Sequence, residues 1–204
     1  MRHSFWDRIA FAYDWAELLN GRAVRAMVQQ VAHLTPQDSL ALDCAAGTGE
    51  LALSMAGRAR RVVCTDLSEE MLRRARRKAQ KRGADNLDFQ AQDLMQLTLG
   101  DDTFDVAAAG NVLHLLRRPE QAVSELLRVT KPGGLVILPT FLQRERNQLR
   151  AAVRLYQLLG FRPVTDFDAD SYRTFLLNSG ARLKQYMVLP GRMPVGLGVL
   201  VKEI

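Results

Sequence analysis

One short stretch, 40–50 (LALDCAAGTGE), constrains the fold of this chain more than any other segment. An apolar run ends in Asp43, two glycines follow among small residues, and an apolar helical segment comes next, an order typical of strand, tight turn and helix. A second apolar run, 61–66, ends in Asp66, which lies 19 residues after Gly47. A separation of about 20 residues is typical of βαβ units in which the acid binds a ribose. The two runs together predict an adenosine-containing ligand at the carboxyl ends of parallel strands.

Short apolar runs alternate with amphipathic helical patterns along most of the chain, which indicates a mainly parallel sheet covered on both faces. Further helices are predicted from Ser68, the expected N-cap, to about Arg82, and from Pro119 to a turn at 131–134. Near the C-terminus, two runs are separated by only five residues (PGRMP), too few for a parallel crossover, so this pair is expected to be antiparallel. Strands are predicted over 40–43, 61–66, 87–91, 104–109, 135–138, 183–189 and 195–202.

Composition narrows the class of protein. The two cysteines, Cys44 and Cys64, are too few for a disulfide framework or a zinc site and are expected to be reduced and buried, and no metal site is predicted. The net charge is +6, and much of it lies in the basic run 73–82. A nucleic-acid surface is one interpretation of that run. A solvated helix face is favoured, because no aromatic residues are interleaved for base stacking.

Three aspartates end successive predicted strands, and in a doubly wound sheet these ends form one crevice. Asp66 is expected to accept hydrogen bonds from both ribose hydroxyls, in a charge-assisted arrangement. Asp93 is expected to accept from the exocyclic amine of adenine. Asp43 is expected to accept backbone N–H groups and so to hold the glycine turn. Apolar residues are expected to sandwich the adenine ring: Leu67, Met71 and Leu94.

A dinucleotide ligand is a weaker alternative. The segment 47–52 satisfies the loose G-x-G-x-x-G/A pattern of dinucleotide sites. However, Asp43 just before the turn would crowd a pyrophosphate with like charge, and the closing antiparallel hairpin is not expected of the usual dinucleotide fold.

Several motifs, spread from about Phe5 to Phe141, resemble those of class I S-adenosylmethionine (SAM)-dependent methyltransferases of the ubiquinone/menaquinone-methyltransferase-like group (methyltransferase type 11). The resemblance implies a Rossmann-like, doubly wound, seven-stranded α/β sheet that is mostly parallel, in the order 3-2-1-4-5-7-6. It also implies an antiparallel C-terminal hairpin and helices on both faces. The matching segments are Tyr13–Asp14, Leu42–Gly49, Asp66–Ser68, Met71–Leu72, Gln92–Leu94, Phe104–Val106, Asn111–His114 and Lys131–Gly134.

The same resemblance implies SAM as the cofactor and assigns further residues to it. Asn111 would approach the amino group of SAM, and Tyr13 its carboxylate. Ala45 stands where the commonest family pattern has glycine, and its methyl group is tolerable if the residue has a negative φ. The turn that would face the methionine part of SAM comprises Ala45, Ala46, Gly47 and Gly49.

Methyl transfer from a sulfonium is an in-line displacement that depends mainly on positioning. His114 is the candidate base for an acceptor that must lose a proton, or it merely packs in a helix. The segment 111–114 (NVLH) lacks the (Asp/Asn)-Pro-Pro-(Tyr/Phe) motif of nucleic-acid amino-methyltransferases, and the cysteines of an arsenite methyltransferase are absent. A small-molecule methyltransferase is therefore predicted. A non-catalytic or regulatory SAM-binding protein is the alternative, followed by an NAD-dependent oxidoreductase.

All 204 residues are expected to form one domain. No run approaches the ~18 apolar residues of a membrane span, and the N-terminus lacks the apolar core of a secretory signal, so a cytoplasmic location is expected. The domain divides into an N-terminal helical cap at 1–36, a cofactor-binding core at 37–141, and substrate-side helices with the closing hairpin at 142–204. Helices within the first and last parts are expected over 5–19, 24–34, 144–159 and 170–179.

Overall fold

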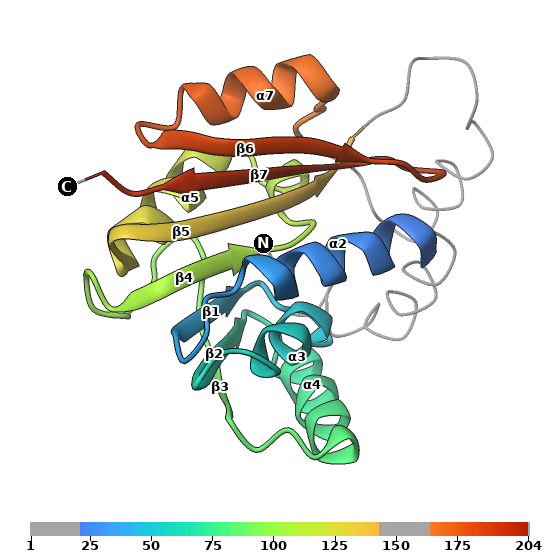
Figure 1. Cartoon of the computed structure of the whole chain (residues 1–204), viewed down its shortest axis with the longest axis vertical. Coiled ribbons are helices and arrows are strands. Elements are labelled where there is room, and N and C mark those ends of the chain that lie inside the picture. The colour runs from blue at the N-terminus through green and yellow to red at the C-terminus, as the bar shows by residue number, and fades with distance from the viewer. Residues whose placement is uncertain (1–20, 143–163, 204) are drawn as a thin grey trace.

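The computed structural model describes residues 21–142 and 164–203. Strands and helices alternate through these residues as the sequence predicts (Figure 1). The helices are α2 (Gly21–Leu34), α3 (Glu50–Ala56), α4 (Glu69–Arg82), the 3₁₀ turn η1 (Leu113–Leu115), α5 (Pro119–Val129) and α7 (Ala169–Leu177). The strands are β1 (Leu40–Cys44), β2 (Arg61–Asp66), β3 (Leu87–Ala91), β4 (Phe104–Ala109), β5 (Thr130–Phe141), β6 (Arg182–Leu189) and β7 (Val195–Val201).

The strands join one seven-stranded sheet in the order β3-β2-β1-β4-β5-β7-β6. The first five strands of this order are mutually parallel, and β7 runs antiparallel to both β5 and β6. The predicted fold class, strand order and antiparallel closing pair are confirmed. Because β1 pairs with both β2 and β4, the chain reverses its direction of travel across the sheet at β1, where such folds have their ligand crevice.

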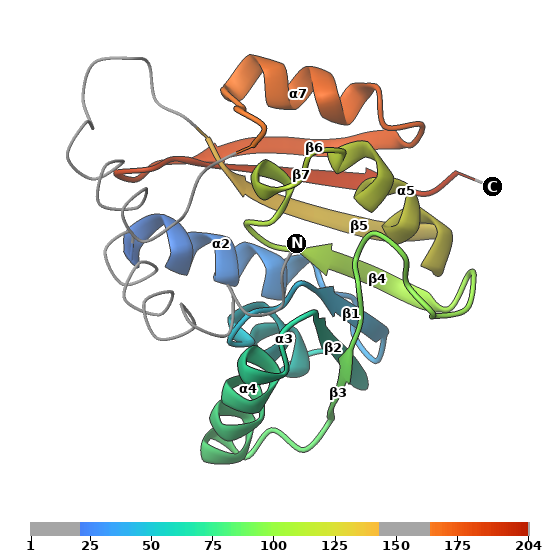
Figure 2. The same ribbon diagram turned by 180° about the vertical axis from the view of Figure 1, so that it is seen from behind.

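Both faces of the sheet are covered by helices (Figures 1 and 2). Neighbouring residues of one strand face opposite sides, so each strand contributes to two cores. Ala41 packs in the core under α2, α3 and α4, whereas Leu42 packs in the core under α5 and α7. Val106 and Ala107 divide between the cores in the same way. This burial on both sides explains why these strands read as continuous apolar runs.

Local signals set the ends of α4 as expected. The Ser68 side chain accepts a hydrogen bond from the Met71 N–H at 3.2 Å, and Gly83 ends the helix in a left-handed conformation. Because β2 ends at Asp66 and α4 begins at Glu69, the start of α4 lies beside Asp66 at the carboxyl edge of the sheet.

Several predicted boundaries differ by two or three residues, and the start of the fifth strand differs most. The fifth strand begins at Thr130 rather than 135, so the Lys-Pro-Gly-Gly segment lies inside β5 and not in a separate turn. The reason is pairing: Thr130 pairs with Phe104, and the Gly133 N–H donates to the Lys202 carbonyl at 2.8 Å. An irregularity in the β4–β5 register accommodates the glycines.

The helices predicted over 5–19 and 144–159 lie outside the described residues, so the division into cap, core and substrate side stays a prediction. Within the described part, no helix is long and apolar enough to cross a membrane.

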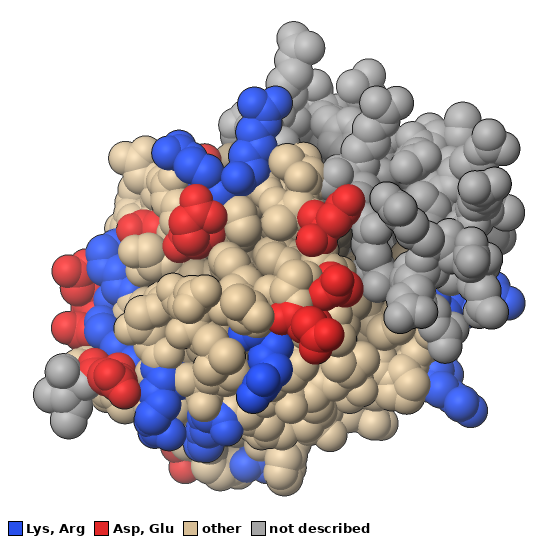
Figure 3. Space-filling view, turned by 90° about the horizontal axis from the view of Figure 1, so that it is seen from above, with Lys and Arg blue, Asp and Glu red and all other residues tan. Residues whose placement is uncertain are grey.

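Cys44 and Cys64 are buried and unbridged, as expected. On the α7 side, acidic and basic side chains are interspersed (Figure 3).

Candidate functional site

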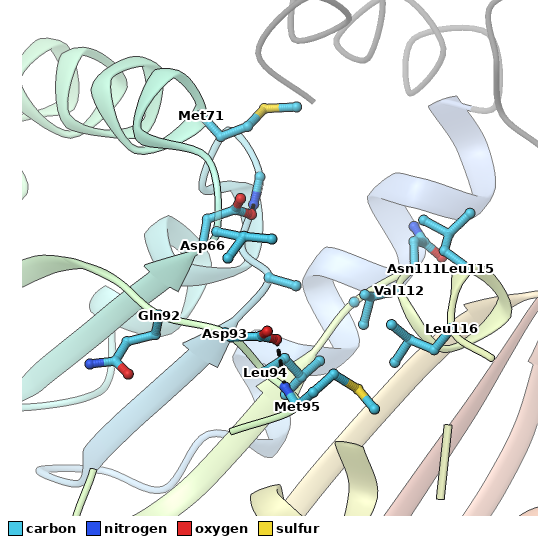
Figure 4. A pocket seen from close by; sticks show the side chains of 14 residues that line it. Asp66, Met71, Gln92, Asp93, Leu94, Met95, Asn111, Val112, Leu115 and Leu116 are labelled. Atoms are coloured by element: carbon cyan, nitrogen blue, oxygen red, sulfur yellow. Dashed lines mark hydrogen bonds between the residues drawn. The ribbon is translucent and has the colours of Figure 1, made fainter. Parts of the chain in front are cut away.

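A cleft lies where the carboxyl ends of β1, β2 and β4 meet the segment after β3. Figure 4 shows Asp66 and Met71 on one side of it, Asn111 and Leu115 on the other, and Asp93 between them. The structure thus brings together most of the predicted cofactor residues, which come from four separate chain segments. The predicted residues that line the cleft are Ala45, Gly47, Asp66, Leu67, Met71, Asp93, Leu94 and Asn111.

The glycine turn between β1 and α3 forms one wall. Gly47 and Gly49 have φ values of +55° and +85°, a region that glycine enters readily. A Cβ atom on Gly49 would lie 2.8 Å from the Cβ of Ala75 in α4. Gly49 is not among the described residues that line the cleft. Its observed role is to let the turn approach α4 closely.

Ala45 contradicts the expectation of a negative φ. Its φ is +50°, in the left-handed region that costs an L-residue roughly 1–2 kcal/mol. The Ala46 N–H donates to the Thr65 carbonyl of β2 at 2.9 Å, which holds the next residue in place. The turn therefore requires a left-handed conformation at position 45. Glycine, the commonest residue of the family at this position, adopts that conformation without strain.

Asp43 is fully buried beneath this turn. Its Oδ2 accepts the Ala52 N–H at 2.8 Å, in the first turn of α3, where helix N–H groups have no partner within the helix. Asp43 thus anchors the start of α3, and its hold on the glycine turn itself stays a prediction. Asp43 and Ala46 line a smaller adjoining cavity, which shares Ala45 and Asn111 with the cleft.

Asp66 links the turn to the start of α4. Its Oδ2 accepts the Gly47 N–H and its Oδ1 accepts the Ser68 N–H, both at 2.8 Å. The carboxylate is only 9% exposed, yet it lines the cleft. A carboxylate offers acceptors only, in two oxygens with about four lone-pair positions, which is the chemistry that two ribose hydroxyls require.

Asp93 and two buried apolar side chains also line the cleft. The Asp93 Oδ1 accepts the Met95 N–H at 2.9 Å, and the residue is exposed to the cleft side. Met71 and Leu94 are 2% and 6% exposed and so present fixed apolar surfaces. A carboxylate beside flat apolar walls suits a planar ring that carries a donor.

Asn111 follows β4 in a left-handed conformation, with φ of +53°. Its side-chain nitrogen lies 3.7 Å from the Met27 sulfur, whereas its buried Oδ1 has no hydrogen-bond partner among the described residues. A buried acceptor without a donor is costly, so this oxygen fits a ligand that brings an N–H group.

His114 lies in η1, and it is not among the described residues that line the cleft. Its Nδ1 is 3.1 Å from the Thr140 hydroxyl, and its ring contacts Phe141 edge-on at 5.9 Å. Burial lowers the pKa of His114 to about 4, so the imidazole is neutral near pH 7. Tyr13 lies outside the described residues.

Several residues of the cleft had no role assigned from the sequence, although Gln92 and Val112 belong to motifs that carry the resemblance. Most are apolar and follow β3 or β4, and their common signal is that they stand just after a strand that ends at the crevice. No group of three or more potential metal-ligating side chains occurs among residues 21–142 and 164–203. The additional lining residues are Gln92, Met95, Gly110, Val112, Leu115 and Leu116.

The strand order, with a glycine turn between two acids at the carboxyl edge of the sheet, is the Rossmann-like arrangement that the resemblance to methyltransferases implied. Residues 42–138 match the family model described as "Methyltransferase domain", which spans β1 to β5 and contains the whole cleft. The resemblance stated from the sequence motifs is therefore confirmed for the core of the chain.

The curated relatives differ in the atom that their names say is methylated. The chain is 35% identical to a ubiquinone/menaquinone biosynthesis C-methyltransferase UbiE of Roseobacter denitrificans, over 56% of this chain and 47% of that protein. It is 33% identical to a phosphatidylethanolamine N-methyltransferase of Cereibacter sphaeroides, over 59% of each. It is 30% identical to a malonyl-acyl carrier protein O-methyltransferase of Methylococcus capsulatus, over 71% of this chain and 53% of that protein. The chain spans about half the length of the curated relatives it matches.

Solved structures share the fold at low sequence identity. The crystal structure of the 4+2 cyclase SpnF superposes with a TM-score of 0.74 at 21% identity, over 89% of this chain and 82% of that chain. A SAM-dependent methyltransferase from Aquifex aeolicus gives a TM-score of 0.67 at 19% identity, over 87% and 92%. Because one of these proteins is titled a cyclase, the fold alone does not determine the reaction.

Proposed function

We propose that this protein is a methyltransferase that uses SAM to methylate a small-molecule acceptor. One observation carries the proposal: the Asp66 carboxylate accepts the Gly47 N–H at 2.8 Å and faces the same cleft as Asp93 and Asn111. That arrangement offers acceptors for a ribose at Asp66, for an adenine amine at Asp93 and for an ammonium group at Asn111.

The chemistry of the described residues supports SAM as the ligand. The buried Asn111 Oδ1 suits the ammonium group of the methionine part. Asp66 suits the ribose hydroxyls, while Leu67, Met71 and Leu94 suit the faces of the adenine ring. Bound SAM would supply an electrophilic methyl group on a sulfonium, which is an excellent leaving group.

The chain's own contribution is to bind, to orient and to exclude water. Rigid anchors hold the cleft, because Asp43 and Asp66 brace the glycine turn from two sides. Positioning the donor and the nucleophile ~3–3.5 Å apart can supply much of the acceleration of a displacement.

His114 as the general base stays a prediction. A neutral imidazole can accept a proton, but a pKa of about 4 makes it a weak base near pH 7. If His114 is the base, His114→Gln lowers kcat/KM by roughly a hundredfold or more. A change of less than about threefold assigns it to packing against Thr140 and Phe141.

The acceptor is part of the test. Relatives named for methyl transfer to carbon, nitrogen and oxygen match this chain to a similar degree, so they support a small-molecule acceptor without selecting one. We therefore choose a panel of demethylmenaquinone, phosphatidylethanolamine and a malonyl thioester. A cytoplasmic location and a single domain over residues 1–204 belong to the same proposal.

The experiment is calorimetric titration with SAM, its demethylated product and NAD side by side. SAM and its product are expected to bind and NAD is not, since the buried Asp43 carboxylate lies under the turn that a pyrophosphate would approach. Binding of NAD in place of SAM would favour the oxidoreductase alternative. Tight SAM binding with no transfer of radiolabelled methyl to the panel or to cell extract would favour a non-catalytic SAM-binding protein.

Replacing Asp66 tests the key contact. Asp66→Ala is expected to weaken SAM binding by roughly 2–4 kcal/mol, because two charge-assisted hydrogen bonds are lost. Asp85→Ala, which removes an exposed carboxylate between α4 and β3, is the matched control and is expected to bind like the wild type. Because Asp66 also accepts two backbone N–H groups, each titration is run well below the melting temperature of the variant. Wild-type affinity in folded Asp66→Ala removes Asp66 from the site.

A further inference from the structure

The segment after β3, residues 92–99, carries the adenine end of the cleft but contains no helix or strand. Asp93, Leu94 and Met95 all line the cleft (Figure 4). Backbone groups in such a segment must find partners elsewhere, and those partners determine where the lining side chains lie.

The direction of the Asp93 carboxylate depends on one neighbouring residue. Its Oδ1 accepts the Met95 N–H at 2.9 Å, the dashed contact in Figure 4. The Gln96 N–H donates to the Asp93 carbonyl at 3.0 Å, which closes a tight turn. A shift of Met95 would therefore move the Asp93 carboxylate as well.

Met95 is in turn held from α5. The Gln121 side-chain nitrogen donates to the Met95 carbonyl at 2.9 Å. Gln121 is half-buried, and α5 is a rigid base because Ala122, Val123 and Leu126 are buried against the sheet. Gln121 itself is not among the described residues that line the cleft, so it can act on a ligand there only through Met95.

Other side chains of α5 hold the following part of the segment independently. Glu125 accepts the Leu97 N–H at 2.8 Å, and Arg128 donates to the Leu97 and Leu99 carbonyls, each at 2.9 Å. Loss of Gln121 would therefore loosen the segment mainly at Met95 and Asp93 and leave 97–99 anchored.

We propose that Gln121 is a positioning residue for adenine recognition, acting on Asp93 through the backbone of Met95. The inference rests on the proposed function, because it takes adenine of SAM as the ring that Asp93 reads. Gln121 lies outside the described lining of the cleft, and in this inference it determines how strongly the protein prefers a purine with an amine over one without.

The test measures a preference rather than a single affinity. The probes are SAM and an analogue whose purine carries a carbonyl in place of the amine, titrated into the full-length chain by calorimetry. The wild type is expected to prefer SAM by about tenfold, because the analogue lacks the donor that Asp93 accepts. Gln121→Leu is expected to reduce this preference to about threefold or less, whereas Gln121→Lys retains a donor for the Met95 carbonyl and keeps most of it.

Coupling between the two positions identifies the route. If Gln121 acts through Asp93, the double variant Asp93→Ala/Gln121→Leu binds SAM no more weakly than Asp93→Ala alone. Ser124→Ala, an exposed change on the same helix, is the matched control with the wild-type preference. Gln121→Ala replaces Gln121→Leu if that variant does not fold, and the ratio of two ligands in one sample is insensitive to the folded fraction.

The outcomes separate this inference from the proposed function. If the wild type does not bind SAM, both fail. Suppose that SAM binds and that Asp93→Ala abolishes the preference for SAM over the analogue. If Gln121→Leu then keeps the preference, or if the double variant binds SAM more weakly than Asp93→Ala alone, the inference about Gln121 is overturned. The proposed function stands in either case.

Discussion

At the scale of single residues, backbone conformation matters as much as side-chain chemistry. Ala45 and Asn111 both have positive φ, and both line the cleft as well as the smaller adjoining cavity. Asparagine tolerates this region better than alanine does, because its short polar side chain can hydrogen-bond locally. The strain at the cleft is therefore concentrated at Ala45.

Relieving that strain is a direct test. Ala45→Gly is expected to raise the free energy of unfolding by roughly 0.5–1 kcal/mol, because the removed left-handed penalty exceeds the entropy that glycine adds to the unfolded chain. Urea denaturation measures the change. Ala46→Gly is the control at a neighbouring residue without positive φ, and it is expected to lose roughly 0.5–1 kcal/mol. A loss of stability in both variants would contradict the assignment of strain to position 45.

At the scale of elements, the approach of α7 to β7 depends on glycines in the strand. A Cβ atom on Gly196 would lie 2.8 Å from the Tyr172 ring, and one on Gly198 would meet the Leu176 side chain directly. Both α7 residues are fully buried, and the Tyr172 hydroxyl donates to the Leu138 carbonyl of β5 at 2.7 Å. The helix is thus held against the antiparallel end of the sheet by contact as well as by a hydrogen bond.

Adding a methyl group at this interface is expected to be costly. Gly198→Ala should lower the free energy of unfolding by roughly 1–3 kcal/mol, because the added methyl group overlaps the fully buried Leu176 side chain. Gly57→Ala is the control: Gly57 has φ of −68°, is exposed and has no close neighbour, so the change is expected to be neutral or stabilising by up to about 1 kcal/mol. Equal effects of the two substitutions in chemical denaturation would contradict the close packing of α7 on β7.

At the scale of the whole molecule, His114 couples the fold to pH. It connects η1 to β5 through Thr140, and burial lowers its pKa from 6.5 to about 4. Unfolding exposes the imidazole, so between these two pH values the unfolded chain binds a proton that the folded chain does not. Stability is fully present above pH 6.5 and falls as the pH decreases toward 4.

The expected loss from His114 is roughly 3 kcal/mol across this window, because each unit of pKa difference between the folded and unfolded states is worth about 1.4 kcal/mol. His114→Gln keeps a polar group beside Thr140 but cannot titrate there. The variant is therefore expected to have a flatter dependence of unfolding free energy on pH between 6.5 and 4, whatever its stability at pH 7.5. Parallel curves for the wild type and the variant, measured by urea denaturation at several pH values, would contradict the buried neutral state.

The sequence by itself determined the order of strands and helices and the acids that end the strands, because these depend on local patterns. The hydrophobic period, the N-cap and the glycines are signals that act over a few residues. Asp66 and Asp93 could therefore be placed at the cleft in advance, whereas Asp43 lies buried beneath the turn. The resemblance to a known family supplied the strand order in the sheet, which local patterns cannot specify.

Only the tertiary structure decided how those residues are used. The left-handed Ala45 results from backbone geometry imposed by β1, β2 and α3 together, and the early start of β5 results from pairing with β4 and β7. His114 contacts Thr140, and Gln121 contacts Met95, which holds Asp93. Each of these two contacts joins residues that are 26 positions apart in the chain. Long-range contacts of this kind leave no periodic trace in a sequence, since only the packed fold brings their partners together.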